Sequence, residues 1–232
     1  MESIGVGITT RNRADVLSFT IEQFHKYDNG QIKYLVVDDH SERPDQNKME
    51  SLRIGDYTYN SHRLGIAKSK NVCIKRLNVD HLFLFDDDCF PTCDGWWEPW
   101  LNLAQHMIFA NPNMGKTRET EDQTWWTGAH GCCMYFTRNC INMVGGFDPE
   151  FLNYGFEHYE LTFRIHKAGL TPHIYISPKD PCIWSFDAQG DYGGFKWGHQ
   201  GCMPNDEKLR EIEASKVILA KILSKQSFYR KI

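Results

Sequence analysis

The sequence contains no long apolar segment and carries no strong charge of either sign. Its longest unbroken run of hydrophobic residues is five, at 132–136, whereas a membrane-spanning helix needs about 20. Residues 1–20 lack the basic start and apolar core of a signal peptide. We therefore expect a cytoplasmic protein with no integral membrane segment. The formal net charge of −4 argues mildly against a protein that binds nucleic acid through a broad basic face.

Cysteine is plentiful, but it is not arranged as in a small disulfide-bonded or zinc-binding domain. None of the eight cysteines belongs to a Cys-x-x-Cys pair. A chain of 232 residues also buries enough surface to fold without cross-links. We expect free, buried thiols, with a zinc site as the lesser alternative. The hydrophobic fraction of 41% and the charged fraction of 24% are those of a globular protein.

Two common nucleotide-binding loops are missing as well. Neither Gly-x-x-x-x-Gly-Lys-Ser/Thr nor Gly-x-Gly-x-x-Gly follows the first apolar stretch, which disfavours P-loop and dinucleotide-binding proteins. The chain does have short apolar runs at 4–9, 34–37 and 81–85 and a weaker strand at 57–59, with helical periodicity at 14–27 and 65–77. This α/β pattern is typical of a mostly parallel sheet covered by helices, and the length favours one domain.

The second half of the chain has a different pattern. We expect helices at 94–109, 157–168 and 205–225, strands at 132–138 and 173–177, and a polar loop at 110–128. Residues 186–202 are rich in glycine and aromatic residues and indicate a long functional loop. Aromatic residues make up 13% of the chain, and we expect the cluster of Trp96, Trp97 and Trp100 to pack in the core.

Polar side chains follow the ends of the predicted strands. Two of these strands end in acidic clusters, Asp38-Asp39 and Asp86-Asp87-Asp88, and the first ends in a basic turn at 9–13. Ligands of open α/β sheets bind outside the carboxyl ends of the strands. Alternate residues point the same way, so Asp86 and Asp88 can face one hard cation, Mg²⁺ or Mn²⁺. The basic turn suits a phosphate-bearing ligand.

With these segments in place, the sequence resembles nucleotide-sugar glycosyltransferases of the GT-A fold, close to family 2. Five segments match in order over about residues 4–170: 8–13, 35–41 (with Val-Val-Asp-Asp), 64–71 (with Ala-Lys-Ser-Lys-Asn), 85–88 (Phe-Asp-Asp-Asp) and 145–161. The resemblance implies one GT-A (Rossmann-like) domain over 1–232. Its nucleotide-donor half would lie at about 1–90, its acceptor half at about 91–204 and a C-terminal helix at 205–232.

The resemblance also implies a reaction and a set of site residues. The enzyme would move a sugar, a hexose or a pentose, from a nucleoside diphosphate sugar to a hydroxyl acceptor, with Mn²⁺ or Mg²⁺ on the Asp-x-Asp motif formed by Asp86 and Asp88. Asp39 would contact the nucleotide base, and Lys70 stands where the family has an arginine. The expected donor-binding residues are Thr9, Arg11, Arg13, Asp39, Lys68 and Asp87.

The segment at 154–158 resembles the acceptor segment of galactosyltransferases and polypeptide N-acetylgalactosaminyltransferases. Inverting relatives place a catalytic Asp where this chain has His158. We expect an inverting reaction in which Glu157, His158 or Glu160 takes the proton of the acceptor hydroxyl. Glu160 has a structural alternative, because Arg164 follows it by four residues on the predicted helix. Should the reaction retain configuration, no such base is needed.

Two further features are assigned through the same resemblance. His199 is the expected late metal ligand, with His173 as the alternative. Trp125 and Trp126 lie near the expected acceptor cleft and are candidate acceptor-binding residues.

Two rival functions and two acceptor classes remain open at this point. The rivals are a GT-A-like nucleotidyltransferase and a non-catalytic carbohydrate-binding scaffold. The acceptor would be a glycan or a modified DNA base. DNA would need a basic groove, for which the candidates are Lys116, Arg118, Lys221, Lys225, Arg230 and Lys231.

Overall fold

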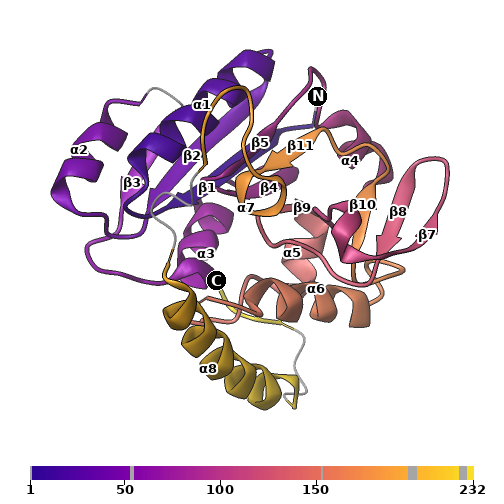
Figure 1. Ribbon diagram of the computed structural model, residues 1–232. Coiled ribbons are helices and arrows are strands. Elements are labelled where there is room, and N and C mark those ends of the chain that lie inside the picture. The colour runs from indigo at the N-terminus through magenta and orange to yellow at the C-terminus, as the bar shows by residue number, and fades with distance from the viewer. Residues whose placement is uncertain (1, 53–54, 153, 198–202, 225–228) are drawn as a thin grey trace.

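The computed structural model describes residues 2–52, 55–152, 154–197, 203–224 and 229–232. Its centre is a six-stranded sheet in the order β3-β2-β1-β4-β9-β6 (Figure 1). Four neighbouring strands are parallel, and β9 runs antiparallel to both β4 and β6. The strands are β1 (Ile4–Thr10), β2 (Ile32–Asp38), β3 (Asp56–Tyr59), β4 (His81–Asp86), β6 (Met107–Ile108) and β9 (Cys133–Thr137).

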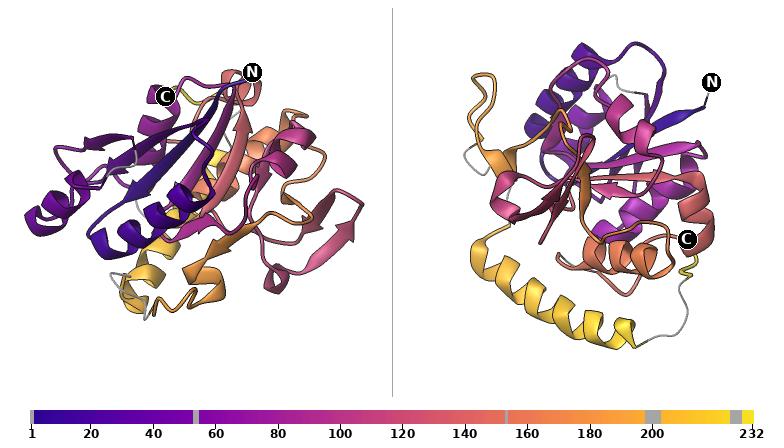
Figure 2. Two further views of the ribbon diagram at one scale, coloured as in Figure 1. Left: turned by 90° about the horizontal axis from the view of Figure 1, so that it is seen from above. Right: turned by 90° about the vertical axis from the view of Figure 1, so that its right-hand side faces the viewer.

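Helices cover both faces of this sheet (Figure 2). Successive side chains of a strand point to opposite faces, so β4 serves both. Phe83 and Phe85 pack with the core under α1, while Leu82 and Leu84 pack with the core under α3, α5 and α6. The helices are α1 (Ala14–Tyr27), α2 (Arg43–Glu50), α3 (Ile66–Arg76), α4 (Glu98–Leu103), α5 (Arg138–Val144), α6 (Glu157–Lys167), α7 (Phe186–Gln189) and α8 (Asn205–Leu223).

Small residues in β1 let α3 approach the sheet closely. A Cβ atom added to Gly7 would lie 2.6 Å from the Cβ of Cys73, closer than two carbon atoms tolerate. The alternation of apolar residues with glycine in this strand therefore reflects helix packing. It also holds α3, which carries the site residue Lys70, close against the sheet.

Two small sheets lie beside the central one. The first has the order β10-β8-β7, from β7 (Lys116–Glu119), β8 (Gln123–Trp126) and β10 (Ile176–Pro178). The second pairs β5 (Cys89–Pro91) with β11 (Ile183–Ser185). A short 3-10 turn at Pro112–Met114 precedes β7. The hairpin of β7 and β8 occupies a stretch for which the sequence predicted a polar loop, so that prediction was wrong.

The predicted helix at 94–109 was also too long. The α-helix covers only Glu98–Leu103 and ends at Ala104, which adopts a left-handed backbone with φ 47°. Residues 107–108 then form β6, which pairs with β9. Trp96, Trp97 and Trp100 are buried in the core, as predicted.

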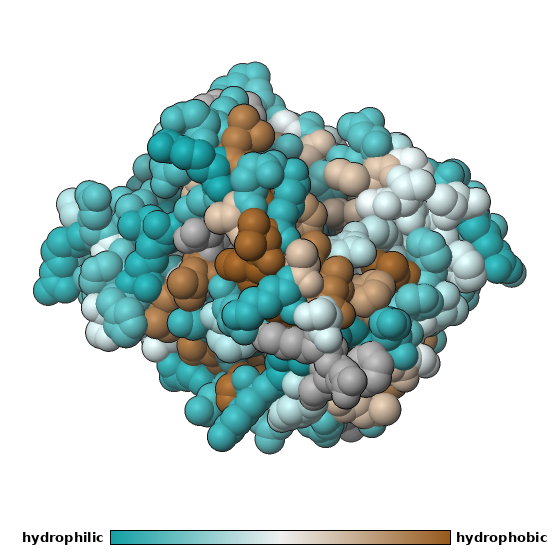
Figure 3. Space-filling view, turned by 90° about the horizontal axis from the view of Figure 1, so that it is seen from below, coloured by the Kyte–Doolittle hydropathy of each residue, from teal (hydrophilic) through white to brown (hydrophobic). Residues whose placement is uncertain are grey.

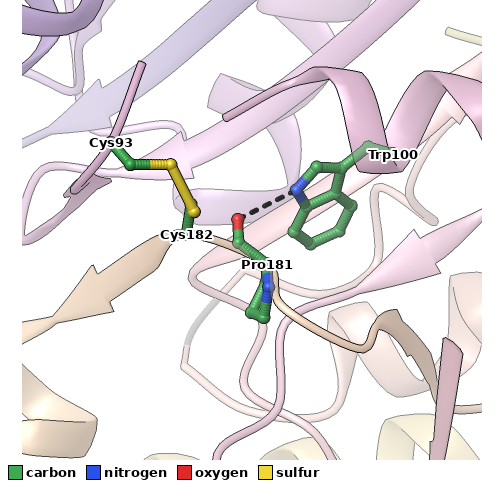
Figure 4. The surroundings of a disulfide bond; sticks show 4 residues. All are labelled: Cys93, Trp100, Pro181 and Cys182. Carbon is green, nitrogen blue, oxygen red and sulfur yellow. Dashed lines mark hydrogen bonds between the residues drawn. A yellow bond between two sulfur atoms is a disulfide. The ribbon is translucent and has the colours of Figure 1, made fainter. Parts of the chain in front are cut away.

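The cysteine prediction needs one correction, because Cys93 and Cys182 form a disulfide (Figure 4). Their Cα atoms are 5.8 Å apart across a sequence separation of 89 residues. Beside the bond, Trp100 Nε1 donates to the carbonyl oxygen of Pro181 at 3.2 Å. No local spacing in the sequence indicates a link between positions so far apart. The other cysteines among the described residues are free and buried, as expected: Cys73, Cys89, Cys132, Cys133 and Cys140.

Removing this disulfide should destabilise the protein. A cross-link that closes a loop of this length restricts the unfolded chain strongly, so we expect the Cys93→Ser/Cys182→Ser variant to lose about 2–4 kcal/mol of unfolding free energy. Denaturant titration of the oxidised protein and the variant measures this difference. Cys140→Ser, which removes a buried thiol outside the bridge, is the control for substitution alone. An unchanged midpoint in the double variant would show that the bridge contributes nothing.

A buried histidine, His106, connects β9 to α6. Its Nδ1 lies 2.8 Å from the carbonyl oxygen of Tyr135, and its Nε2 lies 3.2 Å from Thr162 Oγ1. Burial lowers the pKa of His106 from 6.5 to about 4, although the Tyr135 carbonyl opposes the shift. Between about pH 4 and pH 6.5, therefore, this imidazole is mostly neutral in the folded protein and mostly protonated in the unfolded chain.

This depressed pKa predicts a loss of stability in acid. The unfolded state takes up the proton as pH falls below 6.5, and the folded state does so only near 4, so stability falls across that window. We expect the His106 contribution to fall by about 2 kcal/mol between pH 7 and pH 5. Unfolding curves of wild type and His106→Gln at both pH values isolate it. Equal pH dependence in the two proteins would contradict the assignment.

The C-terminal helix α8 (Asn205–Leu223) lies close to the predicted range 205–225 and is only partly covered. Ile222 is buried, but Leu209 is 63% exposed. Figure 3 shows apolar side chains interspersed with polar ones on the face seen from below. No helix in the described part of the chain is long and apolar enough to cross a membrane.

Candidate active site

The carboxyl ends of β1, β2 and β4 meet at one edge of the central sheet, because these three strands are parallel neighbours. Thr10 pairs with Asp38 in register, and Thr9 pairs with Asp86. The structure therefore brings the basic turn and both acidic clusters together, as the sequence predicted. Ligands of such sheets bind at this edge.

Asp39 is buried and holds the start of α3. Its Oδ1 accepts hydrogen bonds from the Leu64 backbone N–H at 2.7 Å and the Asn60 amide at 3.1 Å, and its Oδ2 accepts from the Gly65 N–H at 2.9 Å. Gly65 has φ 86°, and a Cβ there would collide with the Leu152 carbonyl oxygen. Gly65 and Asp39 together hold the turn that precedes α3. The family resemblance over residues 64–71 therefore includes the residues that form this turn.

The central aspartate of the acidic triplet points into the protein. Asp87 is 2% exposed, and its carboxylate accepts from Thr10 Oγ1 at 2.6 Å and pairs with Arg13 Nη1 at 2.7 Å. Burial is the main reason why the pKa of Asp87 is raised to about 7. Arg13 opposes this rise, and the neighbouring carboxylate of Asp88 adds to it. Asp87 is thus engaged inside the protein, and its role in donor binding stays a prediction.

Arg13 is bound to the acidic triplet itself. Its second guanidinium nitrogen, Nη2, lies 2.9 Å from Asp88 Oδ2. Of the other predicted donor-binding residues, Thr9 is buried, Lys68 is half-buried and Arg11 is exposed. Thr9 Oγ1 is buried and has no hydrogen-bond partner among the described residues.

Lys70 is a site residue that the sequence analysis did not assign. It is completely buried on α3, and its Nζ lies 3.0 Å from Asp86 Oδ1 and 2.9 Å from the Gly131 carbonyl oxygen. Burial alone would lower the pKa of Lys70, but the carboxylates of Asp86 and Glu157 outweigh it and raise the pKa. The available signal was its position, where the family has an arginine.

Glu157 and His158 form a carboxylate–imidazole pair at the start of α6. Glu157 Oε1 lies 3.4 Å from His158 Nδ1, and Glu157 Oε2 is buried with no hydrogen-bond partner among the described residues. Burial opposes ionisation of Glu157, but His158 and Lys70 lower its pKa to about 2. His158 packs against Gly131, where a Cβ would lie 2.8 Å from the imidazole.

Glu160 occupies the structural position that the sequence left as an alternative. Both of its oxygens are bonded by Arg164, at 2.7 and 2.9 Å, and its side chain is 1% exposed. Arg230 approaches Glu160 Oε1 at 3.5 Å. This buried ion pair joins α6 to the C-terminal segment, and it favours the structural role of Glu160 over that of a base.

The tryptophans predicted for the acceptor site lie in the small sheet. Trp126 is buried, with Nε1 donating to Ser177 Oγ at 3.0 Å, so it packs structurally. Trp125 is half-buried, with the Arg118 guanidinium 4.5 Å from its ring centre and His173 stacked at 5.4 Å. That stacking gives His173 a packing role. His199 lies outside the described residues.

The acidic triplet, Asp86-Asp87-Asp88, offers only part of a metal site. No group of three or more His, Cys, Asp or Glu side chains within the described ranges is arranged to hold a metal ion. Asp86 and Asp88 supply two candidate ligands, and each gives one oxygen to a basic side chain, Lys70 or Arg13. Their other oxygens are hard donors of the kind that Mg²⁺ and Mn²⁺ prefer, so the residues fit a divalent cation that another group completes.

Known proteins resemble this chain in sequence and in fold. Uncharacterized glycosyltransferase R363 of Acanthamoeba polyphaga mimivirus is 28% identical over 197 residues, covering 74% of this chain and 76% of that protein. The mannosyltransferase PcManGT of Pyrobaculum calidifontis, solved with GDP-Man and Mn²⁺, superimposes with a TM-score of 0.55 at 16% identity over 73% of this chain. S. aureus TarS 1-349 gives a TM-score of 0.52 at 13% identity over 67%.

This chain spans about half the length of those two solved proteins, 53% and 52% respectively. At these identities the likeness establishes the GT-A fold alone, with the mostly parallel sheet flanked by helices that the sequence predicted. The family model for glycosyl transferase family 2 matches residues 5–170, which include β1, the acidic triplet and all of α6. The chain belongs to glycosyl transferase family 2.

Proposed function

We propose that this protein is a metal-dependent glycosyltransferase that moves a hexose or pentose from a nucleoside diphosphate sugar to a hydroxyl acceptor, with inversion. The observation that carries the proposal is that the candidate metal ligands lie close to the candidate base. Asp86 and Asp88 lie at the ligand-binding edge of the sheet, and Lys70 links Asp86 to Gly131, the residue on which His158 packs. Donor activation and proton removal would therefore occur at adjacent places. Residues 1–90 would hold the donor and residues 91–204 the acceptor.

The charges of this cluster favour a divalent cation. The cluster contains the carboxylates of Asp86, Asp88 and Glu157, and the two basic side chains that contact it are already paired with aspartates. Repulsion from Asp88 and Glu157 contributes to the raised pKa of Asp86, after burial. The structure of PcManGT with GDP-Man and Mn²⁺ and that of TarS with UDP support the choice of ligands.

The chemistry follows from these positions. A bound divalent cation would stabilise the negative charge that develops on the departing diphosphate. Asp86 and Asp88 would hold that cation. His158 would take the proton of the acceptor hydroxyl through an imidazole nitrogen, and Glu157, ionised and bonded to Nδ1, would orient the ring and stabilise the imidazolium. Asp39 would contact the nucleotide base through the turn it holds.

The acceptor that the surface favours is a glycan. Of the basic residues that a DNA groove would use, Arg230 is buried against Asp148, Arg118 lies over Trp125, and Lys221 pairs with Glu150 at 2.8 Å. Lys116 pairs with Glu119. Because these four cations have partners within the described part of the chain, they give little support to a basic path for a phosphate backbone, while Lys225 lies outside the described residues.

The proposal is tested by incubating the protein with individual nucleoside diphosphate sugars and Mn²⁺, then adding glycan acceptor pools to the best donor. We expect Mn²⁺-dependent release of nucleoside diphosphate and a product of inverted anomeric configuration by NMR. Release of pyrophosphate from a sugar phosphate and a nucleoside triphosphate would instead identify a nucleotidyltransferase. Binding of sugars without turnover would identify a scaffold.

A further inference from the structure

Arg13 joins the acidic triplet to a segment that lies far away in the sequence. On one side its two terminal nitrogens pair with Asp87 Oδ1 at 2.7 Å and Asp88 Oδ2 at 2.9 Å. On the other side its guanidinium carbon lies 4.8 Å from the centre of the Trp197 ring. Trp197 is 2% exposed although it lies within the glycine-rich stretch at 186–202. The side chain of Arg13 is itself only 15% exposed.

The Trp197 side of this contact leads back to Asp88. Trp197 stacks on Phe186 with ring centres 5.3 Å apart and planes only 9° from parallel. The Phe186 backbone N–H then donates to the Asp88 carbonyl oxygen at 2.9 Å. Asp88, Arg13, Trp197 and Phe186 thus form a closed circuit. Because Asp191 Oδ1 accepts from the Trp197 N–H at 2.8 Å, the circuit also fixes the intervening turn.

We propose that Arg13 is a positioning residue, which couples the placement of the 186–197 segment to the metal-binding carboxylate of Asp88. The inference rests on the proposed function for the metal, and it replaces the prediction that Arg13 binds the donor. By occupying Asp88 Oδ2, Arg13 leaves Oδ1 to face the cation. Because Arg13 also packs against Trp197, the orientation of the Asp88 carboxylate depends on the position of the 186–197 segment.

The chemistry of the contact requires arginine. A planar guanidinium can hold two carboxylates with separate nitrogens while its face rests on an aromatic ring. A lysine carries the same charge but has one nitrogen and no flat face. Arg13→Lys therefore keeps the local charge and removes only the geometry, which makes it the informative variant.

The test measures Mn²⁺ binding to the nucleotide-free protein by calorimetry, together with donor KM and kcat at saturating Mn²⁺. We expect Arg13→Lys to weaken Mn²⁺ binding about 10-fold, as loss of a residue that orients a metal ligand does. Trp197→Leu should weaken it about 5-fold, and the double variant no more than Arg13→Lys alone, because both substitutions break one circuit. Donor KM should change less than about 3-fold in each.

Two matched variants complete the experiment. Trp197→Phe keeps an aromatic face on Phe186 and should restore Mn²⁺ binding to within about 2-fold of wild type. Arg118→Lys disturbs the other Arg–Trp pair, over Trp125, and should leave Mn²⁺ binding unchanged. Thermal unfolding confirms folding of every variant. If Arg13→Lys fails to fold, the comparison of Trp197→Leu with Trp197→Phe decides the question.

Three results would overturn the inference. Normal Mn²⁺ binding in Trp197→Leu would show that the segment does not act on Asp88. A large rise in donor KM in Arg13→Lys, with Mn²⁺ binding unchanged, would make Arg13 a donor ligand. A wild-type protein that binds no Mn²⁺, either alone or with a nucleoside diphosphate present, would overturn the proposed metal dependence and this inference together, whereas the first two results leave the proposed function standing.

Discussion

Replacing Asp88 with asparagine should reduce kcat/KM at least about 1,000-fold, or roughly 4 kcal/mol of transition-state stabilisation. Asparagine has the shape of aspartate and can still accept from Arg13, so the fold should survive. It loses the negative charge that a hard divalent cation requires of its ligand. The loss should persist when Mn²⁺ is raised, because a weakly held cation is also poorly placed for the departing diphosphate.

Steady-state rates across a Mn²⁺ titration measure this effect, and calorimetry gives the binding constant directly. Asp206→Asn is the matched control, since Asp206 lies exposed at the start of α8 and pairs with Arg210 of the same helix. It should behave as wild type. Full activity of Asp88→Asn at saturating Mn²⁺ would mean that Asp88 is not the ligand on which the reaction depends.

The sequence predicted the first half of the fold well because the information there is local. Helix 14–27 was predicted with the bounds that α1 has, and each of β1, β2 and β4 lies within about two residues of its predicted run. The helix α2 was missed, since its eight residues include only one buried apolar side chain, Met49, and so lack a clear apolar face. Continuous apolar strands and long periodic helices can be predicted from the sequence, whereas a short polar helix cannot.

Long-range pairing accounts for the other errors in the fold. β5 has three residues, directly after Asp88, and its partner β11 lies about 90 positions later. The same separation hides the disulfide between Cys93 and Cys182. No local pattern specifies either contact, so both required the folded structure. They matter to the site because the β5–β11 pair places Phe186 beside Asp88.

The positions of the acidic side chains in the candidate site could be predicted from the sequence, but the positions of the basic side chains could not. Carboxylates that follow an apolar strand are visible in the sequence, and Asp39, Asp86 and Asp88 lie where the motifs placed them. The burial of Lys70 and the attachment of Arg13 to two aspartates are tertiary facts, because a basic residue on an amphipathic helix or turn is normally solvated. Glu160 shows the reverse case, in which an i, i+4 partner was visible and the structure confirmed the Glu160–Arg164 pair.

His158 carries the second large prediction. His158→Ala should lower kcat by about 100- to 10,000-fold, the range that a general base contributes, while Mn²⁺ binding and donor KM stay near wild type. Glu157→Gln should lower kcat less, because an amide can still contact Nδ1 but no longer stabilises the imidazolium. His158→Asp should recover part of the lost rate, since inverting relatives resembling this chain have an aspartate at that position.

This series separates a base from a residue that merely fills space beside Gly131. A packing role predicts that alanine, which leaves a void, and aspartate, which is smaller and charged, are both poor and that both reduce thermal stability. A base predicts partial recovery by aspartate alone, with kcat changing far more than donor KM. Glu150→Gln, which alters an exposed carboxylate paired with Lys221, controls for loss of negative charge on this side of the molecule. Retention of anomeric configuration in the product would contradict the base assignment outright, because a retaining reaction needs no proton acceptor positioned opposite the leaving group.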